Sequence, residues 1–187
     1  MAKAIRYHKQ GGPEVLQLDD IPVGEPGQGQ VRIRHTAIGV NFVDVYQRAG
    51  LYPMQLPGVG GNEGAGVVDA VGPGVKDLKK GDRIAYTGLP GSYCEARIVP
   101  AERMVKLPQG ISDEQAASMM LKGLTVHYLI HTTYPVKKGE TVLWHLKQTA
   151  VPFVVVFVLT NTIIADQRKE NWVARVHLPR IAVHYSL

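Results

Sequence analysis

The stretch from Gly39 to Gly66, GVNFVDVYQRAGLYPMQLPGVGGNEGAG, constrains the fold of this chain most strongly, because seven of its 28 residues are glycine. Glycine and the two prolines of this stretch interrupt regular structure, so the segment must consist of short elements joined by tight turns. One acidic residue, Glu63, lies among the last of these glycines. We interpret this dense arrangement around a single carboxylate as the wall of a ligand site.

A short helix is predicted inside this stretch, over residues 42–49. Asn41 is a preferred N-cap residue, Asp44 follows three positions later, and Gly50 is typical of a left-handed C-cap. Asn41 and Asp44 therefore have a structural explanation, as the helix cap and a carboxylate in the first turn. That explanation stays open beside any functional role.

The residues before about 110 form short apolar segments separated by Gly and Pro turns, at the spacing typical of all-β barrels. We predict strands at 2–7, 15–18, 31–37, 64–72, 82–87, 92–99 and 103–107. The predicted fold class is mainly β with α, with a barrel that extends to about residue 110.

The pattern changes from strand to helix after the barrel. Ser112 and Gln115 have the spacing of a capping box and precede a mostly apolar segment, which predicts a helix over about 113–131. Residues 140–145, ETVLWH, are predicted to form a short apolar strand that opens a parallel sheet. Beyond this strand the capping pattern is lost, although β-branched residues favour strand.

Composition excludes several classes of protein. Residues 1–145 carry 16 basic and 14 acidic residues, so the net charge of +5 does not argue for nucleic-acid binding. Cys94 is the single cysteine, which excludes a disulfide framework and, with no apolar leader, predicts a cytoplasmic location. The longest apolar run has about 14 residues, fewer than the roughly 20 of a membrane-spanning helix, so no membrane span is expected.

Six motifs occur in one order over residues 1–145: HKQGGPEVLQL, AIGVNFVDVYQRAGLYP, GNEGAGVV, VGPGVKDLKKGDRIAY, GSYCEARIV and AASMMLKGLTVHYLI. In these motifs the chain resembles the zinc-independent quinone oxidoreductases, the zeta-crystallin-like branch of the medium-chain dehydrogenase/reductase superfamily. The resemblance implies a GroES-like β-barrel catalytic domain followed by the truncated start of a Rossmann domain. The expected divisions are 1–125 for the GroES-like domain, 126–145 for the remnant of the dinucleotide-binding domain and 146–187 for an atypical tail.

The resemblance implies an NADPH-dependent oxidoreductase that reduces a quinone by hydride transfer from the nicotinamide, without zinc. In the zinc-dependent alcohol dehydrogenases of this superfamily, a cysteine occupies the position of Asn41 and a histidine the position of Asn62. An amide is a poor ligand for zinc. No metal site is therefore expected.

The resemblance also implies candidate site residues. Catalytic roles are expected for Tyr46, Tyr52 and Asn41. Cofactor contacts are expected from Asn41, Asp44, Tyr46, Lys122 and Thr125. The two tyrosines have an alternative explanation as packing residues, and Thr125 has one as a residue that bonds its own helix backbone.

After ETVLWH the chain departs from the family pattern. The family has a glycine-rich turn there, whose backbone N–H groups hold the pyrophosphate, whereas this chain reads LKQTAV and has no glycine after Gly139. The 42 residues after His145 are also far fewer than the roughly 150 of a complete dinucleotide-binding domain. We expect a truncated, impaired protein with weak or absent NADPH binding. The alternatives are a non-catalytic GroES-like binding module and an inactive truncated product.

Three further features have simple structural explanations. Glu63 is interpreted as a buried carboxylate that holds loops through backbone N–H groups, and Cys94 as a packed thiol. The i,i+4 pair His127 and His131 is interpreted as an exposed helical face that lacks a third metal ligand. The same predicted helix carries an apolar face, and unless the tail covers it we expect homo-oligomers or aggregates; its residues are Met119, Met120, Leu124 and Leu129.

Overall fold

The computed structural model describes residues 1–140, 161–166 and 173–177. Contacts divide the chain into two units, Met1–Leu121 and Lys122–Leu187. In the second unit, β9 (Asn161–Asp166) pairs antiparallel with β10 (Val173–His177). The predicted strand at 140–145 lies, apart from Glu140, outside the described residues, and so does the predicted division after residue 145.

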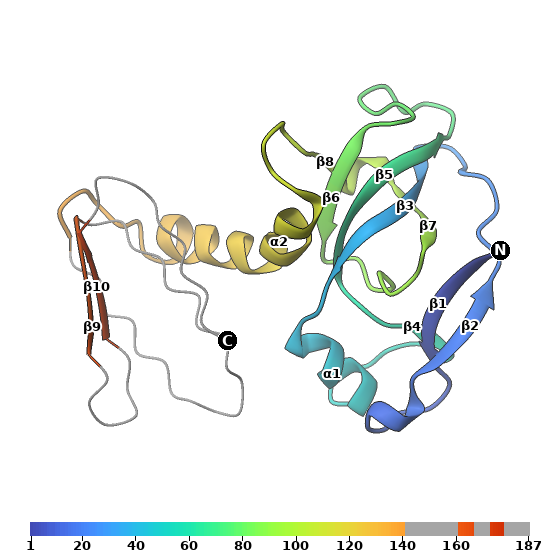
Figure 1. The fold of residues 1–187 in the computed structure, drawn as a ribbon, viewed down its shortest axis with the longest axis horizontal. Helices are drawn as coiled ribbons and strands as arrows, with labels where there is room; N and C mark the ends of the chain where they lie inside the picture. Colours follow the sequence, from blue (N-terminus) through green and yellow to red (C-terminus); the bar gives the residue numbers. More distant parts are fainter. Residues whose placement is uncertain (141–160, 167–172, 178–187) are drawn as a thin grey trace. The chain divides into compact units, whose positions relative to one another are not determined.

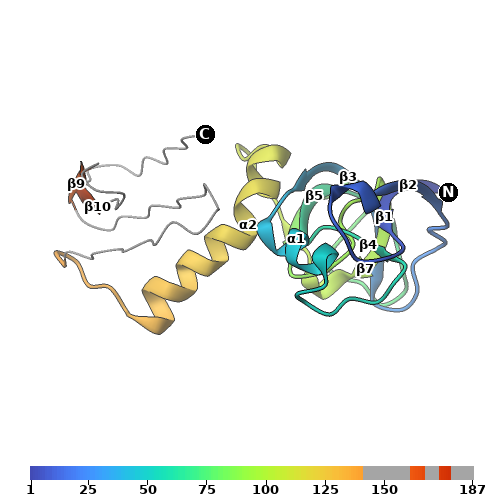
Figure 2. The same ribbon diagram turned by 90° about the horizontal axis from the view of Figure 1, so that it is seen from below.

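The first unit contains two antiparallel sheets that curve around a common interior (Figure 1, Figure 2). The larger sheet has the order β7 (Ala96–Pro100), β3 (Gln30–Gly39), β5 (Glu63–Val71), β6 (Arg83–Thr87) and β8 (Val105–Lys106). The smaller has the order β2 (Gln17–Ile21), β1 (Ala2–Tyr7) and β4 (Gly58–Val59). Residues 93–95 join them, since Ile5 N–H donates to the Tyr93 carbonyl and His35 N–H donates to the Glu95 carbonyl, both at 2.8 Å.

Two apolar clusters fill the first unit. The first consists of the alternating residues of the strands and one loop residue, all at 7% exposure or less: Val31, Ile33, Val68, Leu78, Ile84, Tyr86 and Val99. The second consists of small side chains, Ala65 and Ala85 from β5 and β6 with Ala116 and Ala117 from the second helix. Alanine at all four positions lets the helix backbone approach the sheet closely.

Helix α1 (Phe42–Ala49) has the predicted bounds and caps. The Asp44 carboxylate accepts the backbone N–H of Asn41 at 2.8 Å, and Gly50 closes the helix at φ 85°, which favours glycine. The local signals of this segment therefore suffice to define it.

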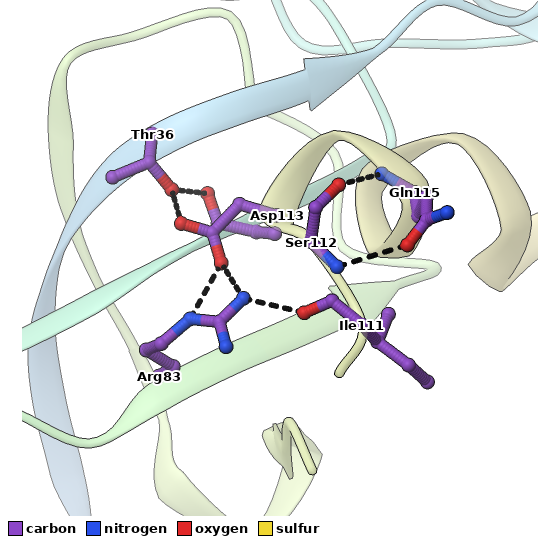
Figure 3. Close-up of polar contacts among 7 residues, drawn as sticks. Thr36, Arg83, Ile111, Ser112, Asp113 and Gln115 are labelled. Atoms are coloured by element: carbon purple, nitrogen blue, oxygen red, sulfur yellow. Dashed lines mark hydrogen bonds and ion pairs between the residues drawn. The ribbon is translucent and has the colours of Figure 1, made fainter. Parts of the chain in front are cut away.

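Helix α2 (Asp113–Tyr128) begins with the predicted capping box, in which the Ser112 N–H donates to Gln115 Oε1 at 3.0 Å and the Gln115 N–H donates to Ser112 Oγ at 3.2 Å. Figure 3 shows that Asp113 ties this end of the helix to the larger sheet. Arg83 donates to its Oδ1 through Nε at 2.9 Å and Nη2 at 2.5 Å, and Thr36 donates to its Oδ2 at 2.6 Å. An ion pair and a hydroxyl thus hold one carboxylate.

The fold class is confirmed as mainly β, with two α-helices among the described residues. Three strand predictions need correction. The segment predicted at 15–18 is strand only from Gln17, where β2 begins, because Val15 is the last residue of a 3-10 turn. The segment 92–99 shortens to β7, and 103–107 shortens to β8. Short apolar alternation does not distinguish a ladder from an irregular segment such as 93–95. Helix α2 ends at Tyr128 and continues as a π-helical turn, Leu129–Thr133, rather than reaching 131 as α-helix. No described helix is both long and apolar enough to cross a membrane.

Candidate functional site

Helix α1 and the loop after it carry a row of aromatic rings. Phe42 and Tyr46 lie edge to face with centroids 5.0 Å apart, and Tyr46 and Tyr52 do so at 5.5 Å. The row is open to solvent, since Tyr52 is 47% exposed. The Tyr46 carbonyl accepts the N–H groups of Leu51 and Tyr52, which turns the chain back over the helix. The structure therefore brings together the two predicted tyrosines, Tyr46 and Tyr52.

Asp44, on the same helix, is buried and binds three donors. Its Oδ2 accepts from the Asn41 N–H at 2.8 Å and from the Tyr93 hydroxyl at 2.6 Å, and its Oδ1 accepts from Asn62 Nδ2 at 2.7 Å. Burial, followed by the hydrogen bond to Asp44, raises the pKa of Tyr93 well above its usual range. The Tyr93 hydroxyl therefore keeps its proton and donates. The Asp44 carboxylate thus holds α1 to two loops.

Asn41 and Asn62 both direct their amide nitrogens to acceptors. Asn41 Nδ2 donates to Glu63 Oε1 at 2.7 Å, and Asn62 Nδ2 donates to Asp44 and also to Gln47 Oε1 at 2.8 Å. Amide nitrogens that donate in this way have no lone pair for a metal ion. In the described part of the chain, no three His, Cys, Asp or Glu side chains are grouped so that they could hold a metal.

Glu63 is fully buried at the start of β5. Its Oε1 accepts from the Asn41 amide, and its Oε2 accepts the backbone N–H of Leu121 in α2 at 2.6 Å. Glu63 is thus a buried carboxylate that accepts a backbone N–H, as predicted, but this N–H belongs to helix α2 and not to a loop, and the second partner is a side-chain amide. Sequence reasoning missed Tyr93 and Gln47, because no local pattern marks a side chain whose partner lies in a distant segment.

The remaining predicted cofactor residues, Lys122 and Thr125, lie on α2 within the second unit, three residues apart and so on neighbouring positions of one helix face. Lys122 is half-buried and Thr125 is exposed. Farther along, the rings of His127 and His131 lie 4.4 Å apart. His127 and His131 are both exposed, and within the described ranges no third His, Cys, Asp or Glu side chain is grouped with them.

A concave region of about 600 Å³ lies apart from the aromatic row, over β1, β3 and residues 93–95. Within its lining, His35 Nδ1 lies 2.6 Å from the Cys94 carbonyl and Nε2 lies 2.8 Å from the Tyr86 hydroxyl. A carbonyl only accepts, so Nδ1 carries the proton and Nε2 accepts from Tyr86. Burial lowers the pKa of His35 to about 4 and raises the pKa of the Cys94 thiol. Cys94, whose thiol donates to the Gly91 carbonyl, is a packed thiol as predicted.

Comparison with known proteins finds one matching family model and several similar relatives. Residues 27–109 match the family model "Alcohol dehydrogenase GroES-like domain". The chain is 52% identical over 147 residues to a quinone oxidoreductase of Pseudomonas aeruginosa, a match that covers 78% of this chain and 45% of that protein. It is 47% identical over 153 residues to a 2-haloacrylate reductase of a Burkholderia species, with coverage of 78% and 46%.

The solved structure of Escherichia coli quinone oxidoreductase complexed with NADPH matches this fold with a TM-score of 0.72 at 45% identity. That match covers 74% of this chain and 43% of the solved chain. The chain therefore spans less than half the length of the relatives that it matches. Together the matches identify residues 27–109 as an alcohol dehydrogenase GroES-like domain, whose homologues include quinone oxidoreductases of the medium-chain dehydrogenase/reductase superfamily.

Proposed function

We propose that this chain forms the barrel part of an NADPH-dependent quinone reductase that works without zinc. The observation that carries the proposal is its 52% identity to a quinone oxidoreductase, together with a relative at 45% identity whose structure contains NADPH. The chain spans less than half of these relatives, so the quinone reductase activity of this chain is a proposal.

The aromatic row of α1 supports a planar ligand. Tyr46 and Tyr52 present two rings in edge-to-face contact, partly open to solvent, and the flat ring of a quinone or a nicotinamide packs favourably against such rings. We assign Tyr46, Tyr52 and Asn41 to the reacting end of the site. Their part in the reaction is to hold the quinone ring and to exclude water from it.

The polar network supports a site without a metal. Asn41 and Asn62 donate to carboxylates, and Asp44 fixes the start of α1 by accepting three hydrogen bonds. Such a network keeps the Asn41 amide in one orientation beside the aromatic row. No Lewis acid takes part in the proposed mechanism.

The chain fits NADPH only in part. When bound, NADPH would supply the hydride that reduces the quinone. The residues assigned to hold it are Asn41, Asp44, Tyr46, Lys122 and Thr125. The sequence has no glycine-rich turn for the pyrophosphate, since it contains no glycine after Gly139. We therefore expect this chain to bind NADPH weakly or not at all by itself.

Three related assignments belong to the same proposal. The GroES-like domain occupies 1–125, the dinucleotide-binding remnant 126–145 and a distinct tail 146–187. The protein acts in the cytoplasm. It associates with itself through apolar residues of α2, where Met119 is 45% and Leu124 53% exposed in the described structure.

Titration of the whole chain with NADPH, followed by cofactor fluorescence, tests whether this chain can act as the reductase by itself. Saturable binding that weakens when Tyr46 is changed to alanine, but not when the exposed Tyr134 is changed to alanine, agrees with it. No binding at millimolar NADPH contradicts catalysis by this chain. The remaining alternatives are then a non-catalytic GroES-like binding module and an inactive truncated product.

The similarity to a 2-haloacrylate reductase favours a second candidate substrate class, an electron-poor alkene. Both classes contain a carbon–carbon double bond conjugated to a C=O group, and the electron-poor β-carbon of that double bond can accept a hydride while the α-carbon takes a proton. Measurement of NADPH oxidation with duroquinone and, separately, with 2-chloroacrylate distinguishes them, because the proposed function requires the faster rate with the quinone.

A further inference from the structure

Glu63 links the N-cap residue of α1 to helix α2 through a single carboxylate. One oxygen, Oε1, accepts from the side-chain amide of Asn41, the residue that precedes α1, at 2.7 Å. The other, Oε2, accepts the backbone N–H of Leu121 in α2 at 2.6 Å. The two partners are 80 residues apart in the sequence, so no local structure ties them to one another.

The surroundings of Glu63 leave it little freedom. The residue is 0% exposed, and its backbone pairs with Gly39 of β3 on one side and with Thr87 of β6 on the other. A β-carbon on Gly39 would overlap both the Glu63 side chain and the carbonyl oxygen of Ala117 in α2. The end of β3, the Glu63 side chain and the α2 backbone are therefore packed in direct contact. A small displacement at one of these groups must be taken up by the others.

We propose that Glu63 is a positioning residue that couples Asn41 to α2, so that a ligand contacting Asn41 changes the hydrogen bond at Leu121. This inference rests on the proposed function, which places Asn41 at the reacting end of the ligand site. Lys122, assigned to the cofactor, directly follows Leu121 in the sequence. The same carboxylate thus sets the orientation of one ligand-binding side chain and the backbone position just before another.

A carboxylate is required because both partners are donors. Each oxygen of an ionised carboxylate accepts, whereas a glutamine amide has one acceptor oxygen and one donor nitrogen. In Glu63→Gln the nitrogen must face either Asn41 Nδ2 or the Leu121 N–H, and one of the two hydrogen bonds is lost. The substitution keeps the size of the side chain and removes the negative charge together with this double acceptance.

Amide hydrogen exchange and proton chemical shifts of the isotope-labelled whole chain test the coupling without any ligand. In Glu63→Gln we expect the amide of Leu121 to exchange about tenfold faster or more, as for loss of a hydrogen bond to a charged group, or the Asn41 side-chain resonances to shift instead. In Asn41→Ala, which leaves Glu63 in place, we expect the Leu121 amide resonance to move. Glu95→Gln is the control for the loss of a carboxylate charge, because the exposed Glu95 carboxylate also accepts a backbone N–H, that of Lys3 at 2.9 Å.

A second experiment, with added ligand, tests whether the coupling extends to the ligand site. Duroquinone added to the wild-type chain should shift the Asn41 and Leu121 resonances with one common Kd, and in Glu63→Gln only one of the two should respond. Leu121 exchange and shifts that remain unchanged in both Glu63→Gln and Asn41→Ala overturn the coupling. If duroquinone fails to bind the wild type, the proposed function fails while the ligand-free comparisons still decide the role of Glu63. If Glu63→Gln does not fold, the shift of the Leu121 amide resonance in Asn41→Ala alone decides whether Asn41 is coupled to α2.

Discussion

The Asp113 anchor of α2 allows a quantitative prediction. In Asp113→Asn the amide oxygen can still accept from Arg83, and the Thr36 hydroxyl can turn to accept from the new amide nitrogen, so the main loss is the negative charge. The Asp113 side chain is 17% exposed and that of Arg83 38%, which places this pair between surface and buried ion pairs. We expect the free energy of unfolding to fall by about 1–2 kcal/mol.

Thermal unfolding of the whole chain, followed by circular dichroism, measures this loss. For a domain of this size, about 1 kcal/mol corresponds to a shift of about 4 °C, so the expected decrease in Tm is about 4–8 °C. Asp20→Asn is the matched control, since the Lys3–Asp20 pair has side chains 50% and 53% exposed and the same change of net charge. The control should lose at most about 0.5 kcal/mol.

The pH dependence of the same comparison tests the ion pair itself. Burial raises the pKa of Asp113, but the hydrogen bond from Thr36 and the charge of Arg83 outweigh it, and the net pKa is lowered. A carboxyl with a lowered pKa contributes stability above its unfolded pKa of about 3.9 and loses it as the pH falls through its folded pKa. The difference between wild type and Asp113→Asn should be constant near neutral pH and shrink below about pH 4. Equal losses in Asp113→Asn and Asp20→Asn, or a difference that persists in acid, would refute this reasoning.

Three further substitutions test other parts of the structure. His35 has its pKa lowered to about 4 by burial, so wild-type stability should fall by up to about 3 kcal/mol as the pH decreases from about 6.5 to 4, and urea titrations of His35→Gln should show a smaller slope in that window. Ser92 Oγ is buried without a hydrogen-bond partner among the described residues, so Ser92→Ala should raise the free energy of unfolding by about 1 kcal/mol; a loss of that size would indicate an undetected partner. Gly39→Ala places a methyl group against Ala117 and Glu63, so the free energy of unfolding in the same titration should fall by about 1–3 kcal/mol. Gly29→Ala is the control for backbone strain alone, because no atom lies within 4 Å of the new carbon while the φ of Gly29 is 70°.

Local signals predicted α1 well. Asn41, Asp44 and Gly50 lie within ten residues, and each acts on a backbone group of the helix that it caps, so the sequence alone contains the whole interaction. The same holds for Ser112 and Gln115 at the start of α2. The first residues of both helices were therefore predictable from the sequence.

The interior of the site was not predictable in the same way. Asp44 accepts a hydrogen bond from Tyr93, 49 residues away in the sequence, and Glu63 accepts one from Leu121, 58 residues away. These contacts depend on how β5 and residues 93–95 come together in the barrel. The strand predicted at 92–99 shows the same limit, because residues 93–95 bond to both sheets instead of extending β7. Alternation of apolar residues gives the direction of a side chain but not the neighbour that it meets.

The central claim is that the aromatic row of α1 and the Asn41 amide bind the quinone. Mapping of duroquinone binding on the labelled whole chain by nuclear magnetic resonance tests it most directly. We predict saturable shifts at Tyr46, Tyr52 and Asn41, and loss of these shifts in Tyr46→Ala. The absence of saturable shifts at these residues, or shifts centred on His35 and Cys94 in the concave region over β1 and β3, would contradict the account.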